Sequence, residues 1–245
     1  MKYELKGDGT IMLSVNQLSG GYLNRRIIND ITFDIQPGEI VGLIGLNGAG
    51  KSTTIRHMTG VLKPHSGNIT IDEKDWMKQR EKLAHIPDKP ELYPNLTIME
   101  HFQFIKRIYQ LNEDHYVNQL IDRYALSPHL NKYPHALSKG TQQKVSIISA
   151  LISNPTYLVV DEPFMGLDPQ GLKFFKEDLI RLKNEGLGMI ISTHLLSIAE
   201  QLCDRIIVLH RGRQQRFNDK SYLTTEDVDG ITLEDLFFSM IEEQE

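Results

Sequence analysis

The chain has 245 residues, of which 40% are hydrophobic and 24% are charged, and its formal net charge is −5. This composition is ordinary for a globular protein, and the negative balance argues against a broad nucleic-acid-binding surface. Its one cysteine, Cys203, excludes an internal disulfide framework and suits a reducing compartment. No apolar run approaches the roughly 20 residues of a membrane span, so we expect a cytoplasmic protein whose role at a membrane, if any, comes through a partner.

The first part of the chain has the pattern of strands and one helix. Residues 12–44 are predicted as strands, with Ile31, Phe33 and Ile35 on one face and a nearly continuous apolar run over residues 38–45. A helix is predicted from Lys51 to Gly60, where glycine ends the pattern. Short strands are predicted within residues 67–76 and 82–87.

The pattern becomes helical from about residue 93 to residue 153. Four apolar residues recur there at helical spacing: Ile98, Phe102, Ile105 and Tyr109. Two further helices are predicted over residues 113–126 and 138–153. The helical stretch therefore interrupts a chain that is otherwise rich in strands.

Strands and helices alternate beyond Pro155, which indicates a parallel, doubly wound sheet. Residues 226–245 carry eight acidic side chains and no basic one. The apolar residues in this segment keep helical spacing: Leu233, Leu236, Phe237, Met240 and Ile241. We expect a short docked helix with a solvated acidic face.

A glycine-rich segment follows the second apolar run and matches the phosphate-loop pattern G-x-x-x-x-G-K-[ST]. Its residues are Gly45, Leu46, Asn47, Gly48, Ala49, Gly50, Lys51, Ser52 and Thr53. Glycines let backbone N–H groups turn inward around an anion, and a helix N-terminus adds positive charge. Lys51 is expected to contact the β and γ phosphates of a nucleotide, and the Ser52 hydroxyl is expected to bind Mg²⁺.

Two later strands end in residues suited to phosphate chemistry. Asp161 and Glu162 follow an apolar strand, at the edge where open α/β sheets bind ligands. Asp161 suits the Mg²⁺ shell, and Glu162 suits polarisation of the attacking water. His194 ends the next strand and suits contact with the γ-phosphate. Taken singly, Asp161 and Glu162 could instead be surface charges, and His194 could be a structural histidine.

Together these motifs resemble the nucleotide-binding subunit of an ABC transporter, from about Leu13 to Ile241. Ser138 looks like a helix N-cap, and the segment Leu137–Gln142 takes the place of the family's signature. The resemblance also assigns Tyr22 to adenine stacking and Asp168 to the D-loop, the short loop that follows Asp161 and Glu162. It implies an α/β P-loop fold with a RecA-like, mostly parallel sheet core, an antiparallel β subdomain and a helical subdomain insertion.

The resemblance divides the single nucleotide-binding domain, residues 1–245, into three parts. Residues 12–92 and 154–212 would form the catalytic core with the β subdomain. Residues 93–153 would form the helical subdomain, and residues 213–245 a C-terminal extension. A separate transmembrane permease would hold the protein at the inner face of the cell membrane.

The resemblance further implies a head-to-tail dimer with a second copy or a paralogue. The signature residues would contact the ATP of the partner: Ser138, Lys139, Gly140 and Thr141. The cofactors implied are ATP and Mg²⁺, and no nucleic-acid partner is expected.

Two motifs depart from the family's pattern, at three positions in all. Lys139 and Thr141 stand in the signature where the usual motif L-S-G-G-Q has glycine and glutamine. Asp88 stands where the family usually has a glutamine that contacts Mg²⁺; its carboxylate could still reach the metal, through water, but it adds negative charge. We therefore expect an active but slow ATPase. The sequences of residues 91–97 (ELYPNLT) and 137–141 (LSKGT) are similar to those of bacterial exporter ATPases of the Ecs and ABC-2 types.

Three alternatives compete with a transport motor. Ribosome-acting relatives usually carry two such domains in one chain, and DNA-repair relatives place long coiled coils before the signature; neither pattern is present here. The second alternative is a regulatory module that has lost turnover. The residues suited to hydrolysis count against it (Lys51, Asp161, Glu162 and His194), whereas Asp88 and Thr141 count weakly for it. A kinase would leave the signature, Glu162 and His194 without roles.

Overall fold

The computed structural model describes residues 12–23, 25–112, 114–215, 223–224 and 232–242. The strands are β1 (Leu13–Tyr22), β2 (Arg25–Ile35), β3 (Ile40–Ile44), β4 (Ser66–Ile71), β5 (Lys74–Asp75), β6 (Leu83–Ile86), β7 (Tyr157–Asp161), β8 (Gly188–Thr193), β9 (Arg205–His210), β10 (Arg213–Gln214) and β11 (Leu223–Thr224). The α-helices are α1 (Lys51–Met58), α2 (Ile98–Ile108), α3 (His115–Arg123), α4 (Lys139–Ile152), α5 (Pro169–Asn184), α6 (Leu196–Leu202) and α7 (Leu233–Glu242). Most of these elements follow the predicted order, with ends shifted by a few residues; the two-residue strands β10 and β11 were not predicted.

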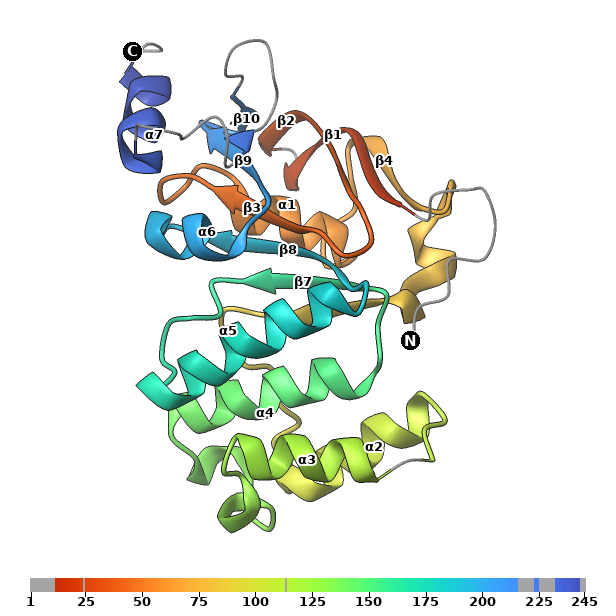
Figure 1. Cartoon of the computed structure of the whole chain (residues 1–245). Coiled ribbons are helices and arrows are strands. Elements are labelled where there is room, and N and C mark those ends of the chain that lie inside the picture. Colours follow the sequence, from red (N-terminus) through yellow and green to blue (C-terminus); the bar gives the residue numbers. More distant parts are fainter. Residues whose placement is uncertain (1–11, 24, 113, 216–222, 225–231, 243–245) are drawn as a thin grey trace.

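Two sheets form among the described residues. One is antiparallel, with the strand order β2-β1-β4-β5. The other has the order β10-β9-β3-β8-β7-β6, with β11 also on β9, and its central pairs β9–β3, β3–β8, β8–β7 and β7–β6 are parallel. This confirms the predicted mostly parallel core with an antiparallel partner sheet (Figure 1).

The alternation of side chains along the parallel strands separates two apolar clusters. Val41, Leu43 and Val159 point to the face that packs with α1 and the antiparallel sheet. Ile44 and Val160 point to the opposite face, which packs with the other helices. Because successive side chains of a strand point to opposite faces, continuous apolar strands such as β3 and β7 are covered on both sides.

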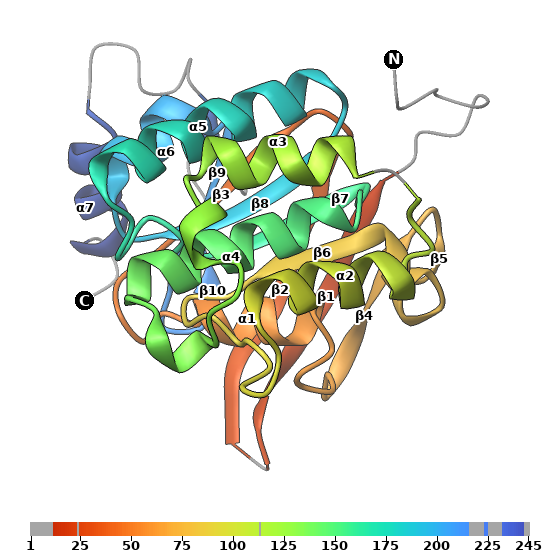
Figure 2. The ribbon, with the colours of Figure 1, turned by 90° about the horizontal axis from the view of Figure 1, so that it is seen from below.

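The helices α2 and α3 pack against α4 on the helical side of the molecule (Figures 1 and 2). Residues 93–153 contain α2, α3 and α4 and, where described, no strand. The division of the chain into a core, a helical part and a C-terminal extension stays a prediction. No helix in the described part of the chain is long and apolar enough to cross a membrane.

The predicted C-terminal helix is present as α7. Leu233, Leu236 and Phe237 are buried, and the Leu233 backbone N–H donates to the Glu200 carboxylate of α6 at 2.9 Å. Glu234 and Asp235 are exposed, which agrees with the expected acidic face. The side chains of Met240 and Ile241, like residues 1–11, lie outside the described part.

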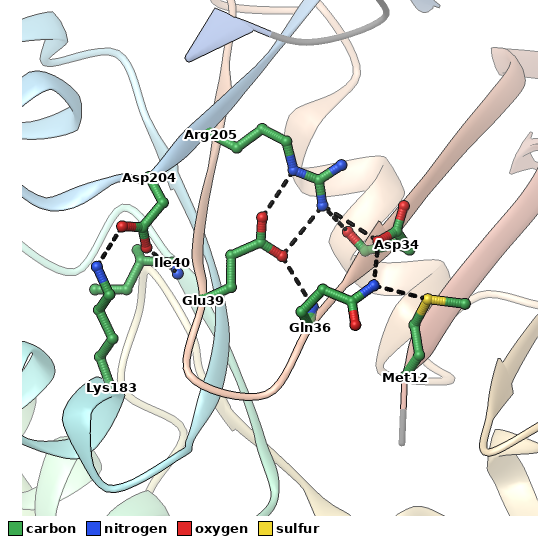
Figure 3. Close-up of polar contacts among 8 residues, drawn as sticks. All are labelled: Met12, Asp34, Gln36, Glu39, Ile40, Lys183, Asp204 and Arg205. Atoms are coloured by element: carbon green, nitrogen blue, oxygen red, sulfur yellow. Dashed lines mark hydrogen bonds and ion pairs between the residues drawn. The ribbon is translucent and has the colours of Figure 1, made fainter. Parts of the chain in front are cut away.

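A network of ion pairs fixes the amino ends of β3 and β9 against β2 (Figure 3). Arg205 donates through Nε to one Glu39 oxygen at 2.8 Å, and through a terminal nitrogen to the other at 3.1 Å and to the Asp34 carbonyl at 2.7 Å. Beside it, Asp204 accepts from the Ile40 N–H at 2.9 Å and pairs with Lys183. The network therefore anchors the turn that leads into β3.

We expect Arg205→Met to lower the free energy of unfolding by about 2 kcal/mol, because it leaves the largely buried Glu39 carboxylate without its cation. Urea unfolding followed by circular dichroism measures the change. Arg80→Met is the matched control, because Arg80 is exposed and forms no ion pair among the described residues. Equal midpoints for both variants would contradict the anchoring role.

Candidate nucleotide-binding site

The glycine-rich segment connects the carboxyl end of β3 to the first turn of α1. Gly50 precedes the helix with φ 111°, a conformation that side chains other than glycine rarely adopt. A Cβ at Gly45 would meet the Leu209 carbonyl oxygen at 2.4 Å, so the loop also needs a glycine where it passes β9. The N–H groups of the first turn of α1 are therefore presented beside a loop with little side-chain bulk.

Lys51 is buried at the first position of α1. Its ammonium group donates to the Gly45 carbonyl at 2.7 Å and lies 3.6 Å from a carboxylate oxygen of Glu162. The cation is thus held over the loop and faces the end of β7. This placement suits a group that binds an anion lying along the loop.

Glu162 and His194 lie together at the ends of β7 and β8. His194 Nδ1 is 2.9 Å from the second Glu162 carboxylate oxygen. The Glu162 backbone has φ 46°, in the left-handed region, and its N–H donates to the Ser192 carbonyl at 3.1 Å. A strained backbone held by its neighbours is often found at functional sites.

Asp161 is buried next to these residues. The Ser192 hydroxyl donates to Asp161, and Ser52 Oγ lies 3.4 Å from the same carboxylate oxygen. His85, on the neighbouring strand β6, is mostly buried, and burial lowers its pKa although Asp161 and Glu91 oppose the shift. The carboxylate therefore has hydroxyl partners and lies near an imidazole whose neutral form is favoured.

The phosphate loop, Glu162 and His194 line one cavity of about 610 Å³, whereas Asp161 is not among its lining residues. Its lining residues are Tyr22, Arg25, Ile27, Leu46, Asn47, Gly48, Ala49, Gly50, Lys51, Ser52, Thr53, Asp88, Glu162, Met165 and His194. The volume is in the range of small-molecule sites. The fold thus brings the phosphate loop, Tyr22, Asp88, Glu162 and His194 around one space, although they are far apart in the sequence.

Tyr22 stands at the outer part of this cavity and is 40% exposed. The guanidinium of Arg56, in the last turn of α1, donates to its hydroxyl and lies 5.8 Å from the ring centroid. The ring is therefore held from α1. Asp88, also on the cavity wall, has an exposed side chain.

The signature residues do not line this cavity. Ser138 caps α4 as predicted: its Oγ accepts from the Thr141 N–H at 3.2 Å and lies 2.8 Å from the Thr141 hydroxyl. Ser138 and Lys139 are exposed. Within one chain, the signature and the phosphate loop therefore belong to separate surfaces.

The structure adds site residues that the sequence interpretation did not name. Ser192 lies between Asp161 and the Glu162 backbone, and Arg25 and Met165 line the cavity. Ser192 belongs to the strand end that delivers His194, so the strand-end pattern gave a signal for it. Arg25 had no such signal, because nothing in the sequence around it predicts that its side chain lines the cavity.

Comparisons with known proteins place this site in a family. The family model described as "ABC transporter" matches residues 28–165, which is more than half of the chain. The chain is 36% identical over 240 residues to the ABC-type transporter ATP-binding protein EcsA of Bacillus subtilis (strain 168), covering 95% of this chain and 97% of that protein.

Solved structures agree with this similarity. A structure described as the ATP binding subunit of an ABC transporter superposes with a TM-score of 0.86 at 37% identity, covering 94% of this chain and 99% of that one. The cbiO1 protein of Clostridium perfringens, described as part of the ABC transporter complex cbiONQ, gives a TM-score of 0.72 at 26% identity, with 96% of each chain covered. The chain belongs to the ABC transporter ATP-binding proteins, a family of ATPases.

Proposed function

We propose that this chain is the ATP-hydrolysing motor subunit of a bacterial ABC exporter and drives a separate transmembrane permease. The observation that carries the proposal is the cavity in which Lys51 and the phosphate loop face Glu162 and His194. The similarity to transporter ATP-binding proteins supports the transport role. The export direction rests on the sequences of residues 91–97 and 137–141, which resemble those of exporter ATPases.

In this proposal ATP lies along the phosphate loop. The N–H groups from Leu46 to Thr53 surround its phosphates, and Lys51 neutralises the β and γ groups. Tyr22 stacks on adenine at the outer part of the cavity, where Arg56 holds its ring. The cavity volume of about 610 Å³ supports a ligand of nucleotide size.

Ser52 and Asp161 fit a Mg²⁺ ion bound with the nucleotide. Their oxygens lie 3.4 Å apart, and hydroxyl, carboxylate, phosphate and water oxygens are the ligands that Mg²⁺ prefers. No cluster of three acidic, histidine or cysteine side chains that could hold a metal by itself is found among the described residues. The ion is therefore expected to depend on the nucleotide, with Asp88 as a further ligand through water, and to supply charge neutralisation at the phosphates.

Glu162 and His194 form the catalytic pair in this proposal. Glu162 polarises the attacking water, and His194 contacts the γ-phosphate and orients that water. Their separation of 2.9 Å lets one group position the other. Lys51, close to the same carboxylate, stabilises negative charge that develops on the γ-phosphate.

A second copy of the chain, or a paralogue, completes the site head to tail. The exposed position of Ser138 outside the cavity of its own chain supports this arrangement. The N-terminal turn of α4, with Ser138, Lys139, Gly140 and Thr141, would meet the γ-phosphate bound to the partner copy. Asp168, in the loop after Glu162, would lie near the same interface.

The permease is proposed to dock at the surface between Asp88 and α2, with the protein on the cytoplasmic side of the cell membrane. Tyr93, Phe104 and Ile108 are all exposed there, and the rings of Tyr93 and Phe104 pack edge to face at 5.2 Å. Exposed apolar groups that gather on one face suit a protein partner. Trp76, on the strand side of this segment, is 8% exposed and packs in the core with the antiparallel sheet, so it is not part of the docking surface.

Glu162→Gln is expected to keep ATP binding while lowering the hydrolysis rate about 10²-fold or more, because the amide cannot act as a general base. Binding of a fluorescent ATP analogue and phosphate release measure the two effects. Lys51→Ala, by contrast, should lose binding, and Glu81→Gln, at an exposed site, should change neither. Normal turnover in Glu162→Gln would move the catalytic role elsewhere.

Asp88→Gln is expected to leave the ATPase rate equal or raise it, because the amide oxygen can still bind the metal while one negative charge is removed from the cavity. Phosphate release over a Mg²⁺ titration measures it. Glu91→Gln, which removes an exposed carboxylate from the same segment, is the control. A large loss specific to Asp88→Gln would show that its carboxylate has a function of its own.

An affinity purification from mildly solubilised native membranes tests the transport role. We expect a polytopic membrane protein to co-purify with this chain in stoichiometric amount. The Tyr93→Ser and Phe104→Ser variant should recover less of it, whereas Ile180→Ser, at an exposed site on α5, should not. Recovery with ribosomes, with DNA or alone would refute the transport proposal and leave the ATP site standing.

A further inference from the structure

The loop that follows Glu162 lies along the first two turns of α4. A Cβ on Gly140 would meet the Gly166 carbonyl oxygen at 2.5 Å, so helix and loop touch backbone to backbone. One helical turn further on, Lys144 Nζ donates to Asp168 Oδ2 at 2.6 Å. Residues 140 and 144 share one face of α4, which therefore holds residues 163–168 at two points.

The surroundings of the Lys144–Asp168 contact hold the lysine side chain in place. The Lys144 side chain is 14% exposed, and a Cβ on Gly171 would meet its Cε at 2.8 Å. The stem therefore lies across the bare backbone at the start of α5. Hydrogen bonds from Lys144 and from the Gly171 N–H lower the pKa of Asp168, so its carboxylate stays charged.

The other end of this loop belongs to the cavity. Glu162 begins it, and Met165 lines the cavity wall. Between them Phe164 is 7% exposed and packs against Phe175 of α5, with ring centroids 6.0 Å apart. The loop is thus short, fixed in the middle, and joined to the site at one end and to α4 at the other.

We propose that Lys144 is a positioning residue for ATP hydrolysis: through Asp168 it fixes the loop after Glu162 to the helix that carries Ser138. The inference rests on the proposed function. The same face of α4 then sets both the position of the signature and the position of Glu162 in one chain. A signature that engages the nucleotide of the partner copy is in this way mechanically connected to the carboxylate of its own site.

A purely structural role for Lys144 makes a different prediction. Asp168 caps α5 through the Gly171 N–H, which donates to Oδ1 at 2.6 Å, and that bond does not need the lysine. Asp168 is 53% exposed, so its ion pair is expected to add little to stability. Loss of Lys144 should therefore act on catalysis far more than on folding.

Lys144→Met, which keeps the stem and removes the charge, is expected to lower kcat about tenfold with KM for ATP and the affinity for a fluorescent ATP analogue within about twofold of normal. Lys144→Arg should keep most of the rate, because its guanidinium can still pair with Asp168. Lys173→Met, at a 72% exposed lysine of α5, is the matched control. Thermal unfolding of each variant reports whether the fold is intact.

An unchanged kcat in Lys144→Met overturns the inference, and so does a loss of rate matched by an equal loss of ATP affinity or explained by unfolding at the assay temperature. If Lys144→Met does not fold, the inference stands only if Lys144→Gln folds and shows the same selective loss of kcat. Failure of the proposed function looks different: if the catalytic role of Glu162 fails, the unaltered protein lacks ATPase activity sensitive to Glu162→Gln, and if the transport role fails, no membrane protein co-purifies. Neither result depends on Lys144.

Discussion

The parallel pairing of β7 with β8 is the constraint on which the site depends, because it places Asp161 opposite Ser192. In this register the Ser192 hydroxyl reaches the Asp161 carboxylate, and the Ser192 carbonyl receives the N–H of Glu162. A shift by one residue would turn Asp161 to the other face of the sheet. Asp161, Glu162 and His194 therefore owe their common location to one strand pair, which is buried on both faces.

The register of β7 and β8 also stabilises an unusual backbone conformation at Glu162. Its φ of 46° is unfavourable for a glutamate, by about 1 kcal/mol or more, and the hydrogen bond to Ser192 holds it there. The turn aims the carboxylate back toward Lys51 and His194. The unfavourable conformation is confined to the Glu162 backbone, whereas the sheet that supports this residue extends through the core. Rigid strands can in this way present a strained residue without a loss of order elsewhere.

The sequence predicted most of the strands and helices, because two-sided apolar strands such as β3 and β7 and the glycine-rich loop have strong local patterns. It also predicted that Lys51, Asp161 and Glu162 meet, since parallel strands end at one edge. The sequence could not predict ion pairs such as Lys144 with Asp168 or Arg205 with Glu39. Their partners are far apart along the chain, and only the register and the packing angle decide which charges meet.

The two contacts of α4 with the loop after Glu162 bear on how far the signature can vary. Gly140 is confined by the Gly166 carbonyl of its own chain, so any side chain there would displace the loop. Position 139 has no such neighbour, because Lys139 is exposed, and Thr141 keeps a hydroxyl within 2.8 Å of Ser138. The departure at position 139 thus falls on an exposed side chain, and the departure at position 141 keeps a hydrogen bond to the helix cap. Contacts within the chain therefore restrict position 140 at the start of α4 and leave position 139 free to vary, whatever a partner copy requires.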